Sequence, residues 1–416
     1  VSKDLTARVL LPQDIVDAHN EGIIHFHDAD YFAQHMHNCD LVNLEDMLQN
    51  GTVISGTLIE KPHSFSTACN IATQIIAQIA SNQYGGQFIS LTHLAPFVDI
   101  SRQKIRRSVL EEIKSFGVQP SEETITNVVE TRLRDEIRAG RRIGPRVLAA
   151  NEAISVPGGH MAGSVAIAAR TVDEALAQVD AVHAQGADLV KLMITGGVMD
   201  ATERGMPGEV KMPAEMVRAV CERAHALGYT VAAHTESTEG VRIALQNGVD
   251  SIEHGAKPDD EILRLFQERG AFLCATFSPA LPYARFDRAV THLTEDEQFN
   301  GRVVFDGMIA CAKAALAHGI PVVLGNDTSC QWVAQYDFWR ELCYFHEYAG
   351  ASNACALYCA TGQSARMAGL GDVTGTLRPG LCADMLVTSE NPLADLRALR
   401  TLDMVVARGR IIDRPR

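Results

Sequence analysis

Two short β-rich runs that each end in a histidine constrain this chain more than any other feature. The run Y-T-V-A-A-H-T contains His234, and the run V-D-S-I-E-H-G contains His254. Between them, E-G-V-R-I-A-L-Q-N-G has the spacing of an amphipathic helix that ends at a glycine. Strands joined by one helical crossover run parallel, so we expect both imidazoles at the carboxyl edge of one sheet. Parallel α/β folds keep their chemistry at this edge, and the pattern therefore predicts a metal site there.

Two further polar residues lie at or near the ends of apolar runs. Lys191 lies in A-D-L-V-K-L-M, and Asp327 follows I-P-V-V-L-G-N. Both runs alternate with helical segments closed by glycine, which predicts repeated β/α units and an α/β fold. Six units are visible, two fewer than an eight-stranded barrel needs, so the expected architecture is a partial (β/α) TIM-like barrel. The strands are predicted at 146–151, 188–193, 230–234, 251–254, 271–276 and 321–327, with helices that include 172–186 and 216–229.

Composition narrows the class of partner. The 416 residues carry a formal net charge of −14, which argues against nucleic acid or an anionic membrane surface and favours a small molecule. No apolar run approaches the roughly 20 residues of a membrane helix. Ten cysteines without regular spacing are typical of reduced thiols, so we expect a cytoplasmic protein, and we expect it to be a homo-oligomer.

The first third of the chain has a different pattern, with amphipathic helices and no regular strand–helix repeat. The phrases G-I-I-H-F-H-D-A-D-Y-F-A-Q-H-M-H-N-C-D-L, P-H-S-F-S-T-A-C-N-I-A-T-Q-I and L-T-H-L-A-P-F-V-D-I-S-R-Q-K-I-R-R occur here. They resemble the catalytic subunit of anaerobic (class III) ribonucleoside-triphosphate reductase, a glycyl-radical enzyme. By that resemblance Cys39 is the reductase-like thiol, with Cys69 a second candidate. Nothing after residue 140 resembles the radical-bearing segments, so a buried structural thiol is the competing interpretation of both cysteines.

His25 and His27 form an H-x-H pair, a spacing that places two imidazoles on one face of a strand where they can share a metal. The pair lies inside a phrase that the reductase resemblance already explains, so these two residues are the weaker metal candidates. The pattern changes abruptly after Gly140, without a flexible linker. This join indicates a fusion of two partial proteins. Three segments are predicted: a mostly helical, reductase-like segment at 1–140, a barrel portion at 141–368 and a C-terminal β-sandwich segment at 369–416.

Ordered motifs in the remaining chain carry a second resemblance. They are G-P-R-V-L, I-S-V-P-G-G-H, V-K-L-M-I-T-G-G-V, A-A-H-T, S-I-E-H-G, G-N-D-T and G-T-L-R-P-G-L-C-A-D-M-L-V. Together they resemble the amidohydrolase superfamily, in particular imidazolonepropionase-like and Xaa-Pro or Xaa-Arg dipeptidase-like metal hydrolases. The first two strands of that barrel, with their H-x-H ligands, are not recognisable here. The closing motif, with its Asp384, is interpreted as a turn and strand rather than as a catalytic element.

The resemblance implies a role for each candidate. Lys191 would be a carbamylated lysine bridging two metals, His234 and His254 metal ligands, and Asp327 both a ligand and the general base. His160, in the P-G-G-H loop, would face substrate. Zinc suits these donors because it favours imidazole nitrogen and carboxylate oxygen, and one or two divalent metals are expected.

The expected function is metal-dependent hydrolysis of a carbon–nitrogen bond in an amide or dipeptide-like substrate, impaired by loss of the H-x-H strand. Two alternatives stay open: a reductase fragment without its radical site, and a non-catalytic scaffold. Residue by residue, other interpretations also stay open. Lys191 alone suits a lysine that extends to solvent from a strand end, the histidines suit the core, and Asp327 suits a helix N-cap.

Overall fold

The computed structural model describes residues 129–142, 144–291, 293–328, 330, 332–333 and 337–412, and the backbone of 52–54 and 57–59. Two compact units divide the chain: 1–108 with 328–337 and 413–416, and 109–327 with 338–412. In the first unit, β1 (Thr52–Ile54) pairs antiparallel with β2 (Thr57–Ile59). The expectations for His25, His27, Cys39 and Cys69 lie outside the described residues.

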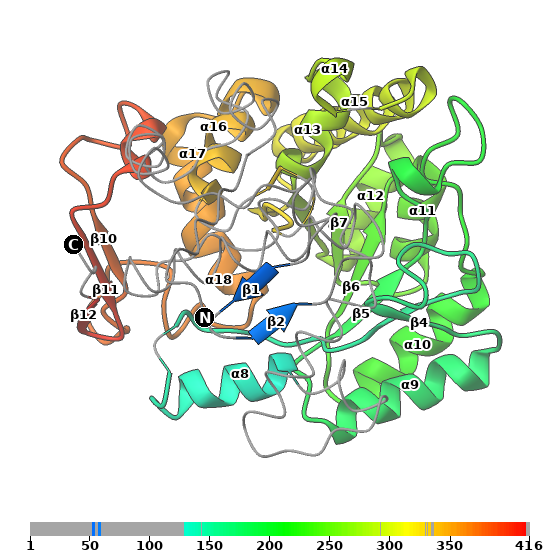
Figure 1. Ribbon diagram of the computed structural model, residues 1–416, viewed down its shortest axis with the longest axis horizontal. Helices are drawn as coiled ribbons and strands as arrows, with labels where there is room; N and C mark the ends of the chain where they lie inside the picture. The colour runs from blue at the N-terminus through cyan, green and yellow to red at the C-terminus, as the bar shows by residue number, and fades with distance from the viewer. Residues whose placement is uncertain are drawn as a thin grey trace. The chain divides into compact units, whose positions relative to one another are not determined.

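Seven parallel strands form the main sheet of the second unit (Figure 1). Their order is β4-β3-β5-β6-β7-β8-β9, so from β5 onward each strand pairs with the next one along the chain. This confirms the α/β class and the parallel arrangement predicted for the histidine-bearing runs. The strands are β3 (Ala153–Ser155), β4 (Ala166–Ala168), β5 (Val190–Met193), β6 (Val231–Thr235), β7 (Ser251–His254), β8 (Phe272–Ala275) and β9 (Val322–Leu324).

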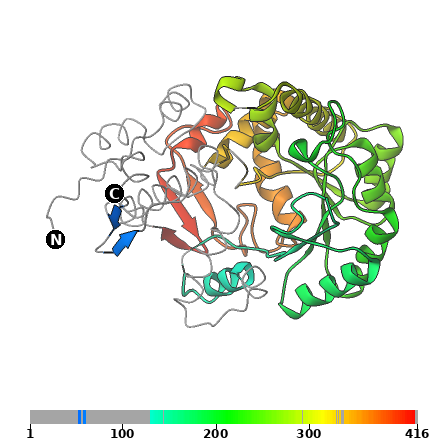
Figure 2. The ribbon, with the colours of Figure 1, turned by 45° about the vertical axis from the view of Figure 1, so that its right-hand side comes forward.

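Helices cover the outer side of this sheet (Figures 1 and 2). The predicted helices at 172–186 and 216–229 are confirmed as α9 and α10, each followed by a glycine with positive φ. The helices are α8 (Val129–Arg138), α9 (Val172–Ala184), α10 (Ala214–Ala226), α11 (Thr238–Gln246), α12 (Asp260–Arg269), α13 (Phe277–Arg285), α14 (Arg288–Thr291), α15 (Glu295–Ala317), α16 (Phe338–Ala349), α17 (Asn353–Tyr358) and α18 (Ser364–Met367). Shorter turns are η2 (Val198–Asp200), the π-helical η4 (Cys359–Gln363) and η5 (Leu396–Arg400).

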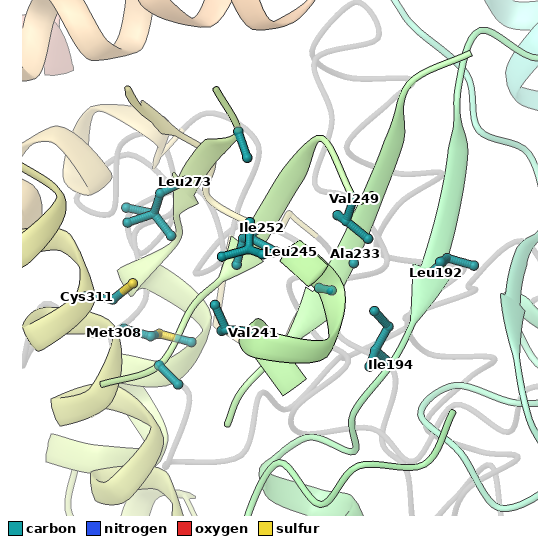
Figure 3. Packing of buried hydrophobic residues seen from close by; sticks show 14 of the residues in the cluster. Leu192, Ile194, Ala233, Val241, Leu245, Val249, Ile252, Leu273, Met308 and Cys311 are labelled. Atoms are coloured by element: carbon teal, nitrogen blue, oxygen red, sulfur yellow. The ribbon is translucent and has the colours of Figure 1, made fainter. Parts of the chain in front are cut away.

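Strand alternation separates a packed face from a polar face. Leu192, Ala233, Ile252 and Leu273 point into the apolar core between sheet and helices (Figure 3). Residues of the other parity therefore point away from that core. They include Lys191 on β5 and His234 on β6, so the apolar face fixes the register and thereby presents the polar side chains on the opposite face.

The strand predicted at 146–151 is wrong. This segment has no regular secondary structure, because side chains bind its backbone where a strand would pair with a neighbour: the Ala149 N–H donates to Asp188 Oδ2 at 2.8 Å. Asn151 has φ +56°, which ends an extended run. The first strands of the sheet are instead β3 and β4, two three-residue pieces that the sequence pattern did not indicate.

Helix α8 packs against the start of the barrel portion. Arg134 donates to the Gly186 carbonyl and to Asp188, both at 2.7 Å, and the Ile137 side chain is buried. At the other end of the chain, β10 (Met385–Val387), β11 (Met404–Ala407) and β12 (Arg410–Ile412) form an antiparallel sheet. Within the described residues, no helix combines the length and the apolar character that crossing a membrane requires.

The closing motif of the chain is structural, as predicted. Asp384, within this motif, accepts hydrogen bonds from the Arg408 N–H and from the Thr374 hydroxyl, both at 2.7 Å. The same carboxylate forms an ion pair with Arg146, far away in the sequence. Asp384 therefore joins the C-terminal sheet to the segment that precedes β3.

Candidate metal centre and active site

His234 and Glu236 extend from the carboxyl end of β6. They are two residues apart, so strand alternation directs both side chains to the face opposite Ala233, which is in the apolar core. The Glu236 N–H donates to Thr195 Oγ1 at 3.0 Å, and Thr195 is fully buried, which fixes the backbone just past the strand. The local sequence H-T-E thus delivers an imidazole and a carboxylate to one place.

His254 reaches the same place by a different route. Its parity matches Ile252, which points into the apolar core, so simple alternation would direct the imidazole away from His234. His254 instead has φ +70° and the next residue, Gly255, has φ +80°. Positive φ is strained for a non-glycine residue and clusters at functional sites. This turn leaves the His254 ring edge-on to the His234 ring, with centroids 4.7 Å apart.

The side chains of His234, Glu236 and His254 form a group that can hold a metal ion. One ligand atom from each lies within 4.8 Å of the others. Glu236 Oε2 is buried and makes no hydrogen bond within the described residues. Burying an unpaired carboxylate oxygen is costly, and a bound cation would satisfy it. Two imidazoles and one carboxylate are also donors that zinc accepts, so these residues fit the metal that the sequence predicted.

The protonation states favour the same interpretation. Burial lowers the pKa of His254 to about 4, and burial with the charges of neighbouring His254 and His160 lowers the pKa of His234 well below its ordinary value. Both rings are therefore neutral at pH 7 and retain a lone pair. Burial also raises the pKa of Glu236 to about 8, and the charges of Asp327 and Asp200 add to the effect. A divalent cation would reverse that penalty by pairing with the ionised carboxylate.

His160 lies against this group from the loop after β3. Its Nδ1 is 2.5 Å from Asp200 Oδ2, and the same carboxylate oxygen accepts from the Gly197 N–H at 2.9 Å. The hydrogen bond with His160 lowers the pKa of Asp200, which keeps this carboxylate ionised. An ionised Asp200 accepts a hydrogen bond from the Nδ1–H of His160, which fixes the orientation of the ring and leaves Nε2 as its free edge.

Lys191 and Asp327 lie near the group without belonging to it. Lys191 is on β5, and its positive charge lowers the pKa of both His234 and His254. Asp327 follows β9 after two residues, and its negative charge raises the pKa of His254. The φ of Asp327 is +48°, so this residue, like His254, has a strained backbone at a strand end. The structure thus gathers the predicted lysine, aspartate and histidines at one edge of the sheet, while their metal and catalytic roles stay predictions.

Sequence reasoning missed Glu236, Asp200 and Thr276. Glu236 had a detectable signal, since it follows His234 by the two-residue period that brings strand side chains to one face. Asp200 lies on η2, forty residues from His160, and no local pattern connects the two. Thr276 Oγ1 is 2.7 Å from His254 Nδ1, a contact between neighbouring strand ends that only the fold creates.

Comparison with known proteins separates two parts of the chain. Residues 1–136 match the family of anaerobic ribonucleoside-triphosphate reductases. The enzyme of that name from Escherichia coli strain K12 is 45% identical over 114 residues, which cover 27% of this chain and 16% of that protein. The chain therefore spans about a sixth of the length of this relative. The reductase-like arrangement is confirmed as a resemblance, and the role of Cys39 stays a prediction.

The larger part matches relatives described as a prolidase and a dipeptidase. A crystal structure assigned as a prolidase from Bifidobacterium longum has a TM-score of 0.64 and 39% identity, covering 68% of this chain and 70% of that one. A Xaa-Pro dipeptidase with bound methionine in its active site has a TM-score of 0.63 and 28% identity, covering 69% and 73%. Residues 110–412 match the amidohydrolase family over most of the chain. This chain belongs to the amidohydrolase family and carries a reductase-like segment at its N-terminal end.

Proposed function

We propose that the second unit hydrolyses the amide bond of a dipeptide-like or cyclic amide substrate with the help of a divalent cation, expected to be zinc. The observation that carries the proposal is the group formed by His234, His254 and Glu236. It contains two neutral imidazoles and a buried carboxylate oxygen that has no hydrogen-bond partner among the described residues. Membership of the amidohydrolase family supports hydrolysis of a carbon–nitrogen bond. The likeness to a Xaa-Pro dipeptidase supports dipeptides as the substrate class.

The roles follow from chemistry and position. A bound divalent cation polarises a carbonyl and lowers the pKa of water. Asp327 is the proposed base: it accepts a proton from the attacking water and returns it to the nitrogen as the C–N bond breaks. His160, oriented by Asp200, presents Nε2 towards the substrate. Lys191, if carbamylated by carbon dioxide, would supply a carboxylate-like donor for a second cation.

Metal content measured by mass spectrometry tests the proposal first, on full-length protein purified without chelator. We expect close to one equivalent of zinc or another divalent metal per chain, and a large loss in the double variant His234→Gln/His254→Gln. Less than about a tenth of an equivalent in the unmutated protein would contradict a metal site. The protein is then supplied with zinc and assayed on Xaa-Pro and Xaa-Arg dipeptides.

The same experiments discriminate the alternatives. Stoichiometric metal without turnover of any dipeptide would favour a non-catalytic scaffold. The reductase alternative, a fragment without its radical site, predicts nucleotide binding, which isothermal titration calorimetry with ribonucleoside triphosphates measures, and no such binding is expected here. The cytoplasmic location and the homo-oligomer stay predictions, which fractionation and light scattering would check.

A further inference from the structure

The first turn of α13 has an unusual capping arrangement. Thr276 occupies its N-cap position, and threonine in that position ordinarily accepts a hydrogen bond from the helix backbone. Here the Thr276 side chain makes no such bond. Its Oγ1 lies instead 2.7 Å from Nδ1 of His254, the candidate metal ligand on the neighbouring strand. The hydroxyl that would cap the helix is therefore committed to the imidazole.

A second residue supplies the missing cap. Glu341, on α16, is fully buried, and its two carboxylate oxygens accept from the N–H groups of Phe277 at 2.6 Å and Ser278 at 2.8 Å. The Ser278 hydroxyl donates to the same carboxylate at 2.5 Å. Three donors at the start of α13 thus converge on one carboxylate from a helix more than sixty residues away in the sequence. Glu341 thus binds the unpaired N–H groups of the first turn, so the Thr276 hydroxyl is not needed as the cap.

We propose that Glu341 is a positioning residue for the metal ligand His254 and acts through Thr276. By holding Phe277 and Ser278, the carboxylate fixes the backbone on the C-terminal side of Thr276 and thereby the place of its hydroxyl. In this arrangement the N–H at Nδ1 of His254 donates a hydrogen bond to that hydroxyl, and Nε2 keeps its lone pair for a metal. The inference deepens the proposed function and rests on it for the metal.

The burial of the site supports this chain of contacts. Thr276 and His254 are both at least nine-tenths buried, so water does not replace their hydrogen bond easily. Partners that hold the second nitrogen of a ligating histidine fix its tautomer and orientation, and their removal typically costs 10- to 100-fold in metal affinity. Removal of a buried carboxylate that serves only stability would not lower metal affinity in this way.

The test compares Glu341→Gln, Thr276→Val and the double variant in the full-length protein. Both substitutions keep the size of the side chain. The amide introduced by Glu341→Gln has one acceptor oxygen, so it can accept only some of the hydrogen bonds that the carboxylate accepts. Zinc affinity is measured by competition with a chromophoric chelator, and unfolding free energy by urea titration. We expect each single variant to bind zinc about 10- to 100-fold more weakly. We expect the double variant to lose no more zinc affinity than the weaker-binding single variant, because both substitutions act through the one contact between Thr276 and His254.

Asp250→Asn is the matched control. Asp250 Oδ2 also accepts a backbone N–H, that of Val231 at 2.7 Å, but at the amino end of β6, away from the candidate ligands. This variant is expected to lose stability while zinc affinity stays within about twofold. Unchanged zinc affinity in Glu341→Gln, or losses that add in the double variant, would overturn the inference.

A readout on the metal-free protein keeps the inference separate from the proposed function. The ¹⁵N shifts of the His254 ring are recorded on histidine-labelled protein and assigned with His254→Gln. We expect the Nδ1-protonated signature in the unmutated protein and a shift towards averaged tautomers in Glu341→Gln. If the unmutated protein binds no zinc, the metal-dependent function fails and these shifts alone decide. Identical shifts in the two proteins would overturn the positioning role.

Discussion

The imidazole of His160 stacks on the imidazole of His234, with ring centroids 4.1 Å apart and planes 6° from parallel. This contact joins the loop after β3 to the end of β6. It holds the ring of a loop residue against the candidate ligands at the strand ends. The stack keeps the His160 ring plane fixed, and Asp200 at Nδ1 fixes its rotation in that plane. Together the two contacts define where Nε2 of His160 points.

Asp200→Asn tests that orientation. The oxygen of the introduced amide can still accept from the Gly197 N–H, which leaves the amide NH₂ facing Nδ1 of His160. Nδ1 must then accept from the amide instead of donating to a carboxylate, which reverses the hydrogen bond that orients the ring. If His160 acts on substrate, we expect turnover to fall by about 10²- to 10⁴-fold with little change in stability. Steady-state kinetics and urea unfolding measure the two effects, and undiminished turnover would remove His160 from the mechanism.

Glu236→Gln separates metal binding from folding. An amide is a poor substitute for a carboxylate as a zinc ligand, so we expect zinc affinity to fall sharply. In the metal-free protein the substitution removes a buried carboxylate whose Oε2 has no hydrogen bond in the described residues. Stability without metal is therefore expected to stay equal or rise. Urea titrations with and without zinc check both signs, and an equal loss of stability in both conditions would contradict the ligand role.

Gly255→Ala tests the backbone turn that re-aims His254. An added Cβ would lie 2.9 Å from Leu273 Cδ1 and 3.0 Å from Cys311 Sγ, and φ is +80°. Strain and crowding together predict a loss of about 2–4 kcal/mol. Gly270→Ala is the control, since φ is +64° but the added Cβ would meet nothing within 4 Å. We expect about 1 kcal/mol for this control, so equal losses by thermal or urea unfolding would mean that crowding at Gly255 is unimportant.

Parts of this fold were predictable because their signals are local. The strands that carry Lys191, His234 and His254 combine apolar alternation with helices that end at glycine. The start of the sheet was not predictable in the same way: β3 and β4 are three residues long, and the segment before them looked more strand-like than either. Its backbone is bound by Asp188, a side chain that the fold brings from 39 residues away.

The site shows the same division. The histidines lie at strand ends, where sequence and topology together locate them. Glu341 could not be found in this way, because nothing around it in the sequence indicates that it caps α13. Ser278, which it binds in the first turn of that helix, lies 63 residues earlier in the chain. The stacking of His160 on His234 likewise depends on how a loop folds over the sheet. Residues that orient the candidate ligands are therefore harder to predict than the candidate ligands themselves.

The raised pKa of Glu341 predicts that the free energy of unfolding depends on pH. Burial raises its pKa to about 7 from an ordinary value near 4.5. Between these two values the folded state holds a proton that the unfolded state has released, so this group's contribution to stability is full below pH 4.5 and is lost as pH rises towards 7. The shift corresponds to on the order of 3 kcal/mol.

Glu341→Gln removes this titration. We expect the unfolding free energy of the unmutated metal-free protein, relative to Glu341→Gln, to decrease as the pH rises from 4.5 to 7. Urea titrations of both proteins at half-unit intervals measure the difference. A difference that is constant across this range would show that the pKa of Glu341 is not raised in the folded protein.

Asp327→Asn addresses whether the proposed site produces the activity. The substitution is nearly isosteric, and asparagine adopts the left-handed backbone region readily, so φ of +48° at this position is retained without new strain. Fold and stability are therefore expected to stay unchanged. An amide cannot accept the proton of the attacking water, so turnover is expected to fall by about 10²- to 10⁴-fold.

The comparison needs a sensitive assay on Xaa-Pro and Xaa-Arg dipeptides supplied with zinc, because the H-x-H pair that the resemblance implies is not recognisable in the barrel portion of this chain. Circular dichroism serves as the control that the variant is folded, and zinc affinity shows whether Asp327 also acts as a metal ligand. Equal residual rates in the unmutated chain and in Asp327→Asn would mean that another site produces the observed activity. The hydrolase interpretation would then hold for the ancestry of this chain and not for its present chemistry.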